Sequence, residues 1–332
     1  MNGTGRWKTY VWREHLFSVG GVRDRDLLFF AKPLSAYTAA KFQAEEVDEF
    51  PRIKAGEKAL ILRSSHTCLD ASFVEWVTYR AETEGKNYSF GAGWAIVNAE
   101  PIHLAKYCPI KGAAALLSPV DIPFVTEKIR LEILKSFMRK GVIFESTDGV
   151  YVDSTAKLKS GARISHDVTV TGESVIESGA YIKPYTVVEE SEVESGAQIG
   201  PFVHLRPHSK IGKNCKIGNF TEVKNATLGA GTKAAHLSYI GDAELGEGCN
   251  VGCGTVFVNY NGKEKFRSKI GDGCFIGSNV NVVAPVHMSD GSYVAAGSTL
   301  TRDLQGGDLC IARARETVYP HRAQNYYPQT KR

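Results

Sequence analysis

The sequence predicts a mainly β protein: a long solenoid of short parallel strands, preceded by one linker helix and a small mixed α/β domain. Three observations predict it. A large aliphatic residue recurs every six positions through the second half of the chain, a small residue recurs with the same period, and one stretch of helical spacing stands before the first repeat. A period of six fits neither a helix nor a plain alternating strand, and it is typical of stacked coils.

Residues 1–122 differ in kind from the rest of the chain. They contain all four tryptophans, a strand-like apolar run at 58–63 and a possible helix near 34–46. Strands and helices mixed in this way indicate an α/β domain. The sequence assigns this domain no function.

Residues 123–149 are predicted to form a linker helix and a turn. The segment 124–140 reads FVTEKIRLEILKSFMRK, in which apolar residues follow largely helical spacing. Thr126 is expected to cap the start of this helix and Gly141 to terminate it.

Residues 150–305 carry the six-residue repeat. Three repeats are expected to close one triangular coil, with the aliphatic side chain inside and the small one near the corner. Cysteines at three small positions are therefore expected to act as compact apolar residues rather than as reactive thiols. The aliphatic series begins Val152, Leu158, Ile164, Val170, Ile176, Ile182, Val188, and the small series includes Ala156, Ala162, Ser209, Cys215, Thr221, Thr232, Cys249, Thr255, Cys274 and Ser298.

The repeat is broken in two places. Between positions 258 and 269 the polar segment VNYNGKEKFRSK replaces it, so this segment is expected to leave the solenoid as an excursion, and such insertions often form a binding site. Residues 306–332 form a tail that is expected to cap the open end of the solenoid.

Composition excludes several classes of protein. The net charge is only +4 over 332 residues, too weak for a nucleic-acid binder. The chain has no apolar stretch of membrane-spanning length, and its seven cysteines show neither a CxxC pair nor zinc-ligand spacing. A cytoplasmic protein without a structural metal, bound to neither membrane nor nucleic acid, is expected.

A family resemblance extends over the solenoid. The repeat resembles the left-handed parallel β-helix of hexapeptide-repeat acyltransferases. Moreover, LRPHSKIGKNCKIGNFTEVKNATLGAGTKAAHLSYIGDAELGEGCNVGCGTVFVNYNGKEKF, followed by IGSNVNVVAPV, VAAGSTLTRD and IAR, resembles the acetyltransferase half of the bacterial bifunctional enzymes that make UDP-N-acetylglucosamine. The resemblance implies a left-handed coil, acetyl-CoA as acyl donor, glucosamine 1-phosphate as acceptor, and a homotrimer with sites between adjacent solenoids.

The same resemblance implies the acceptor site. His236 falls on the family's general base, and a neutral imidazole is suited to removing a proton from an ammonium substrate. Arg206 and Lys224 match the residues that hold the sugar phosphate, for which a guanidinium and an ammonium are suitable partners. The further acceptor positions are Tyr239, Asn250 and Lys265.

The implied acyl-donor positions are spread over the excursion, two later coils and the tail. Two residues near them depart from the family pattern: Cys253 stands where an alanine is usual, and Asn261 replaces an acidic residue. Either change could alter the acyl group accepted. The donor positions are Cys253, Asn259, Tyr260, Ser278, Ala296 and Arg313.

The other half of the family's bifunctional enzymes has no counterpart here. Residues 1–122 lack the Gly-rich loop that cradles nucleotide phosphates, so no uridylyl transfer, UTP or Mg²⁺ is expected. Two alternatives remain. The first is an acyltransferase for a nucleotide-linked or natural-product amino sugar. The second is a non-enzymatic or metal-binding hexapeptide-repeat trimer, for which the candidate ligands are His204, His208, His236 and His287.

Overall fold

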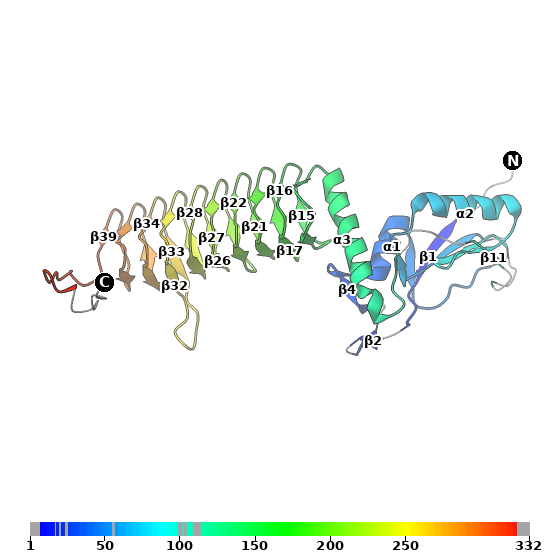
Figure 1. Ribbon diagram of the computed structural model, residues 1–332, viewed down its shortest axis with the longest axis horizontal. Coiled ribbons are helices and arrows are strands. Elements are labelled where there is room, and N and C mark those ends of the chain that lie inside the picture. Colours follow the sequence, from blue (N-terminus) through cyan, green and yellow to red (C-terminus); the bar gives the residue numbers. More distant parts are fainter. Residues whose placement is uncertain are drawn as a thin grey trace, which may run out of the picture. The chain divides into compact units, whose positions relative to one another are not determined.

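The computed structural model divides into two compact units, Met1–Glu190 and Ser191–Arg332 (Figure 1). It describes residues 7–16, 18–19, 21–23, 26–54, 57–98, 102, 105–108 and 114–323. The first six residues of the predicted α/β domain and residues 324–332 of the predicted tail lie outside the described residues. In the described ranges, no helix combines the length and the apolar character that crossing a bilayer requires.

The first unit begins with a mixed β-sheet, which confirms the predicted α/β domain. Strand β7 (Ala59–Arg63) lies at its centre, parallel to β1 (Lys8–Trp12) and antiparallel to β10 (Gly93–Ile96). The sheet order is β11-β9-β10-β7-β1-β6. The other strands of this sheet are β6 (Glu45–Val47), β9 (Tyr88–Ser89) and β11 (Lys106–Tyr107). Three two-stranded pairs lie outside it: β2 (Ser18–Val19) with β3 (Val22–Arg23), β4 (Leu28–Phe29) with β5 (Lys32–Pro33), and β8 (His66–Thr67) with β12 (Ala114–Ala115).

Two helices cover one face of this sheet. Helix α1 (Leu34–Phe42) lies within the predicted segment 34–46. Helix α2 (Ala71–Glu84) is not predicted from the sequence, although Asp70 caps its first turn and Gly85 ends it at φ +62°; only Val74, Val77 and Ala81 are buried along it. Three tryptophans of the domain belong to two apolar clusters: Trp7 packs with the helices, whereas Trp12 and Trp94 pack with Phe50 on a separate cluster.

Helix α3 (Ile122–Arg139) forms the predicted linker and follows a single 3₁₀ turn, η3 (Pro119–Asp121). The prediction that Thr126 caps it is wrong: Ser118 and Asp121 form a capping box ahead of it, and the Thr126 hydroxyl donates to the Ile122 carbonyl inside the first turn. Gly141 follows the last turn at φ +88°, a conformation that favours glycine, so its predicted role is confirmed.

The first coils of the solenoid belong to the first unit. Their strands pair in parallel with residues eighteen positions on, as Tyr151 does with Thr169, so three six-residue repeats make one coil. Val152, Ile164 and Val170 are at most 1% exposed, as expected of inward aliphatic positions. The strands are β13 (Ile143–Phe144), β14 (Tyr151–Val152), β15 (Lys157–Leu158), β16 (Arg163–Ile164), β17 (Thr169–Thr171), β18 (Val175–Ile176), β19 (Tyr181–Ile182) and β20 (Val187–Glu189).

The second unit continues the pattern, and the predicted fold class is confirmed. Three parallel ladders enclose an apolar interior, and the small positions Ser209, Cys215 and Thr255 are fully buried. The strands are β21 (Glu192–Val193), β22 (Gln198–Ile199), β23 (His204–Leu205), β24 (Lys210–Ile211), β25 (Lys216–Ile217), β26 (Thr221–Lys224), β27 (Thr227–Leu228), β28 (Lys233–Ala234), β29 (Ser238–Gly241), β30 (Ala243–Leu245), β31 (Asn250–Val251), β32 (Val256–Val258), β33 (Ser268–Ile270), β34 (Phe275–Ile276), β35 (Asn281–Val283), β36 (His287–Met288), β37 (Tyr293–Val294), β38 (Thr299–Leu300) and β39 (Leu309–Cys310).

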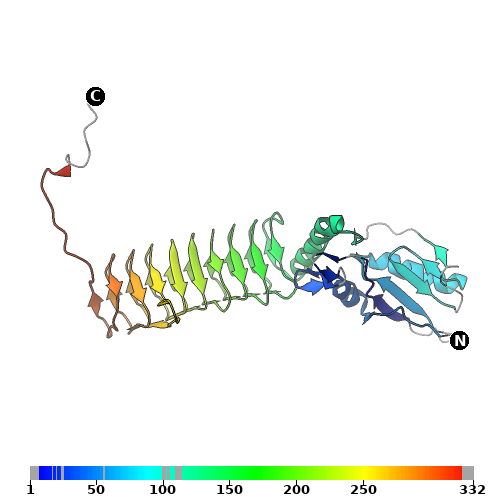
Figure 2. The same ribbon diagram turned by 90° about the horizontal axis from the view of Figure 1, so that it is seen from below.

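The two interruptions of the repeat take different forms. The segment between β32 and β33 leaves the coil as a projecting loop, as predicted (Figure 1). The tail does not cap the solenoid beyond its first residues. Leu304, just before the tail, is buried against the last coil, and β39 pairs with β37, but residues 311–323 are exposed and extend away from the solenoid (Figure 2).

The predicted structural role of the corner cysteines fits their burial. All seven cysteines are free thiols; Cys215, Cys249 and Cys274 are buried, whereas Cys253 is exposed. Burial raises the pKa of all three buried thiols, that of Cys215 to about 11. These thiols therefore stay protonated, and the reactive thiolate is suppressed.

We expect this difference in burial to appear as a difference in alkylation rate. In the native protein at pH 8, iodoacetamide should modify Cys253 about 10²-fold or more faster than Cys215, because the buried thiol reacts only when the coil opens. Peptide mass spectrometry over a time course measures both rates. The same reaction in guanidinium chloride is the control and should equalise them, and equal rates in the native protein would contradict the buried assignment.

Candidate active site

One face of the second unit carries most of the predicted acceptor residues. Strands β23, β26, β29, β32 and β35 form this face, which we call the site sheet. Their register is parallel and continuous: Glu222 pairs with Tyr239, Tyr239 with Val256, and Val256 with Asn281. Side chains from successive coils therefore stack in rows across the sheet.

Three cations meet at the end of the site sheet where the loop departs. Arg206 lies beside Lys224, because the preceding residues Leu205 and Val223 pair, and its guanidinium forms an ion pair with Glu222 at 2.8 Å. The charge of Lys265 is the main cause that lowers the pKa of Lys224, with smaller contributions from burial and from Arg206. We call Arg206, Lys224 and Lys265 the cation cluster. Such like charges favour a bound anion.

His236 lies at the opposite end of the site sheet, on the corner before β29. Ala234, which precedes it in β28, is fully buried and occupies the inward position, so the imidazole of His236 is exposed. Its Nδ1 lies 3.4 Å from Oδ1 of Asn219, which stands one coil earlier. A proton on Nδ1 can be donated to this amide oxygen, which leaves Nε2 able to accept a proton.

Three of the predicted donor residues, Cys253, Ser278 and Ala296, lie at the same corner of later coils as His236. The backbone N–H groups of Gly254, Asn279 and Gly297 donate to carbonyls of the preceding coils, at Leu237, Cys253 and Ser278 respectively, with N···O distances of 2.7, 2.7 and 2.8 Å. These bonds stack equivalent corner residues above one another. We call the resulting row the corner column, and its members are Asn219, His236, Cys253, Ser278 and Ala296.

The corner column ends beside Arg313. A β-carbon built on Gly297 would lie 3.9 Å from Cδ of Arg313, so this side chain passes next to Ala296. Cys253, Ser278 and Ala296 are all exposed. The structure thus places an exposed row of small side chains between the imidazole of His236 and the guanidinium of Arg313.

The two residues predicted to contact the sugar lie on different sheets. Tyr239 is on the site sheet, and its ring covers Gly241, where a β-carbon would lie 2.5 Å from the phenol oxygen. Asn250 is on β31, before the corner, where it pairs with Phe275. Both are half-buried, and together they flank the corner from two sides.

The two donor residues of the excursion lie at a different corner from Ser278 and Ala296. Asn259 is 8% exposed, and its side-chain amide donates to the carboxylate of Asp242. Tyr260 is exposed, pairs with Lys265 in an antiparallel bridge, and donates its hydroxyl to the Gly262 carbonyl. One chain therefore carries its predicted donor residues in two groups, at the two ends of the site sheet.

The comparisons with known proteins concern this same region. The family model "Bacterial transferase hexapeptide (six repeats)" matches residues 190–225 and 267–302. The matched segments of the solenoid carry the hexapeptide repeat of this family model. Arg206, Lys224, Ser278 and Ala296 lie within the matched segments, and His236 and the excursion lie between them.

Several curated relatives carry the name bifunctional protein GlmU, which confirms the resemblance. The chain is 42% identical to that of Clostridium novyi (strain NT) over 240 residues, covering 65% of this chain and 53% of the relative. It is 55% identical to that of Clostridium beijerinckii over 115 residues, covering 35% and 25%. The chain spans about half the length of the GlmU proteins of Clostridium novyi and Clostridium acetobutylicum.

Sequence reasoning missed three polar residues of this candidate site. Asn219 is the hydrogen-bond partner of His236, and Asn225 and Asp242 hold the base of the excursion. The spacing of one coil was the sequence signal that could have found them, because Asn219 stands one coil before His236 and Asn225 stands one coil before Asp242. In the described residues, no three His, Cys, Asp or Glu side chains come together in a way that could hold a metal ion.

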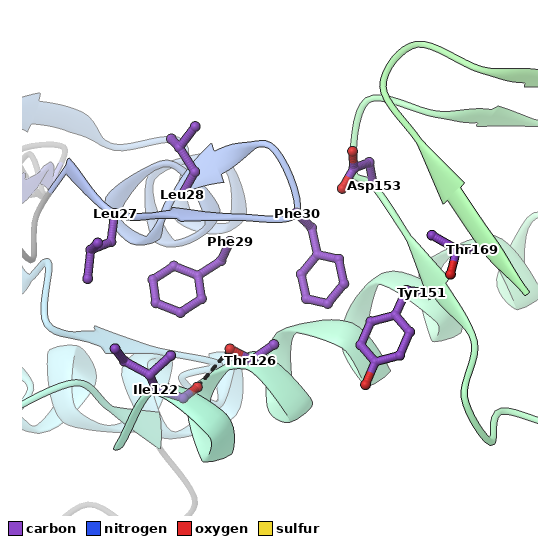
Figure 3. Close-up of a pocket in the computed structure, with 9 residues that line it drawn as sticks. All are labelled: Leu27, Leu28, Phe29, Phe30, Ile122, Thr126, Tyr151, Asp153 and Thr169. Atoms are coloured by element: carbon purple, nitrogen blue, oxygen red, sulfur yellow. Dashed lines mark hydrogen bonds between the residues drawn. The ribbon is translucent and has the colours of Figure 1, made fainter. Parts of the chain in front are cut away.

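The first unit contains cavities that other residues line. One of about 400 Å³ lies between the β4 turn, the start of α3 and the first coil, with Phe30 stacked on Tyr151 at 6.2 Å between ring centroids (Figure 3). A second of about 670 Å³ lies between α1 and α3. Neither contains a residue that the sequence assigned to the site.

Proposed function

We propose that this protein is an N-acetyltransferase that transfers acetyl from acetyl-CoA to the amine of glucosamine 1-phosphate or a closely related amino-sugar phosphate. One observation carries the proposal: the cation cluster and His236 stand at opposite ends of the same short strand face. Residues 238–241 of β29 span about 10 Å along the strand. The long side chains of Arg206 and Lys224 reduce the distance between the cation cluster and His236, so one sugar phosphate fits between the cluster and the imidazole. The similarity to GlmU supports it.

The geometry supports direct transfer. The phosphate binds to the cation cluster, which orients the sugar so that its amine faces His236. Nε2 of His236 accepts a proton from the ammonium, and the freed amine attacks the thioester carbonyl of acetyl-CoA. A C–N bond forms, the C–S bond breaks, and coenzyme A leaves as a thiol after taking a proton. The corner column and Arg313 are positioned to guide the donor toward His236.

We further propose that the active form is a homotrimer with sites between adjacent solenoids. The two groups of donor residues in one chain support this arrangement, because a second copy can bring its excursion to the corner column of the first. An exposed apolar stripe beside His236 supports it as well: Phe202 and Phe220 are stacked at 5.4 Å, and Leu237 is 57% exposed. The seven free thiols suit a cytoplasmic location, and no membrane or nucleic-acid partner is proposed.

The assembly proposal predicts a specific mass. Sedimentation equilibrium should give about three times the chain mass of 36.2 kDa. Replacing Phe220 with Asp should shift the protein toward the monomer and remove activity together with assembly, because the substitution places a charge in the apolar stripe. A monomeric wild-type protein with full activity would contradict the shared site.

The function is tested by identifying products. Purified protein is incubated with acetyl-CoA and, separately, glucosamine, glucosamine 1-phosphate, glucosamine 6-phosphate or UDP-glucosamine, and products are detected by mass spectrometry. We expect N-acetylation of glucosamine 1-phosphate and little reaction with unphosphorylated glucosamine. Efficient acetylation of UDP-glucosamine alone would replace the proposed acceptor with a nucleotide-linked amino sugar, and no acetylated product from any acceptor would reject the function.

A further inference from the structure

A buried carboxylate lies at the base of the excursion, near the cation cluster, and it is not one of the residues of that cluster. Asp242 is 8% exposed and follows β29 at φ +48°. Its Oδ1 accepts from the Asn225 amide at 2.5 Å, and its Oδ2 accepts from the Asn259 amide. Three polar side chains on three successive coils thus form one hydrogen-bonded row, which we call the amide column: Asn225, Asp242 and Asn259.

The amide column holds both ends of the excursion. Asn259 is the last residue before the loop departs, and its side chain is fixed by the carboxylate of Asp242. Ser268 is the residue at which the chain returns, and its N–H donates to the backbone carbonyl of Asp242 at 3.1 Å. Between these ends, the N–H of Phe266 donates to the carbonyl of Asn259 at 2.8 Å and closes the loop.

A second side chain ties the returning end to the same column. The guanidinium of Arg267 donates to the carbonyl of Asn225 at 3.1 Å and to the carboxylate of Glu244 at 2.8 Å. Lys265 stands two residues earlier in the loop. Lys265 pairs with Tyr260, the residue after Asn259, so its position near Lys224 depends on a loop whose base is anchored to the amide column at each end.

We propose that Asp242 is a positioning residue: by binding the amides of Asn225 and Asn259 it fixes the excursion so that Lys265 completes the phosphate site with Lys224 and Arg206. The ammonium groups of Lys224 and Lys265 repel each other, so an unanchored loop would let the Lys265 ammonium move away into solvent. The buried carboxylate opposes this movement through two charge-assisted hydrogen bonds, and its negative charge near Lys224 also favours the protonated ammonium. This inference rests on the proposed function only for its kinetic test.

The first test needs no activity. Trypsin can cleave the excursion after Lys263, Lys265 or Arg267, but only when the loop leaves its anchored conformation. Asp242→Ala should raise the rate of cleavage in this segment of the folded protein about tenfold, because both side-chain anchors are lost. Asp290→Ala is the matched control: Asp290 also accepts a bond from another coil, the N–H of Asp272 at 2.8 Å, but it is not part of the loop's base.

The second test separates positioning from a general loss of stability. Asp242→Ala should raise the KM for glucosamine 1-phosphate about tenfold and leave kcat within about twofold, since the lost contact binds the acceptor. In a Lys265→Ala background the same substitution should cost little more, because the two residues act through one contact. Asp242→Asn can keep both bonds when a neighbouring amide rotates, and it should stay close to wild type.

Three results would overturn the proposal. Unchanged cleavage of the excursion in Asp242→Ala would show that the column does not hold the loop. Additive effects of Asp242→Ala and Lys265→Ala would show that they act separately. A loss in Asp242→Asn as large as in Asp242→Ala would assign the effect to charge alone.

If Asp242→Ala does not fold, Asn225→Ala, which removes one of the two anchors of the carboxylate, should raise cleavage by a smaller factor. A protein inactive on every acceptor would reject the proposed function, while the cleavage test would still decide the role of Asp242.

Discussion

Replacing His236 with Ala should lower kcat by about 10² to 10⁴, the usual contribution of a positioned general base. The thermal unfolding midpoint should change little, because the imidazole is exposed and the inward position of its coil is filled by Ala234. Steady-state kinetics and thermal denaturation of the wild type and the variant measure these two effects.

His287 provides the matched control for this prediction. It is also an exposed histidine on the solenoid, but it lies on β36, outside the site sheet and the corner column. His287→Ala should retain the wild-type kcat. A folded His236→Ala protein with near-normal kcat would remove His236 as the base.

Removing Arg206 or Lys224 should mainly weaken acceptor binding. Each substitution with Ala should raise the KM for glucosamine 1-phosphate roughly 10- to 100-fold, corresponding to about 1.5 to 3 kcal/mol for a charge-assisted contact. The KM for acetyl-CoA should change little. Steady-state kinetics with each substrate varied in turn measures both values.

Lys224 adds a pH signature to this prediction. Lys265 and Arg206 lower its pKa, so Lys224 loses its charge at a lower pH than an isolated lysine does. Acceptor KM should therefore rise as pH increases toward the pKa of Lys224, and in Lys265→Ala this rise should move to higher pH. Lys216→Ala, on β25 outside the site sheet, is the control for a lost surface charge. An unchanged acceptor KM in both Arg206→Ala and Lys224→Ala would indicate an unphosphorylated acceptor.

The N-terminal domain shows where sequence patterns gave only partial information. The run of buried residues in β7 and the segment of α1 were predictable, because each carries a local apolar signal. Helix α2 was not, since only Val74, Val77 and Ala81 are buried along its length. The start of α3 was misjudged for a related reason: Thr126 has the side chain of a capping residue, but Ser118 and Asp121 already supply the cap upstream.

The solenoid was predictable because its interior admits one kind of residue at one spacing. Every coil must place an aliphatic side chain inside and a small one at the corner, so the sequence by itself determined the repeat, the inward residues, the buried cysteines and the excursion. It also indicated, through the family resemblance, most of the residues of the site.

Only the tertiary structure decided which of these residues meet. Contacts between coils depend on register, and the register changes along the chain: Glu192 pairs with Lys210, but Lys210 pairs with Thr227, and Asn250 pairs across the excursion with Phe275. The aliphatic series slips by one residue at Leu228, which marks the second of these shifts in the sequence, but the side chains that then touch across the coils are fixed by the hydrogen-bonded ladder. For this reason the partnership of His236 with Asn219, the approach of Lys265 to Lys224, and the anchoring of the excursion by Asp242 became visible only when the coils were stacked.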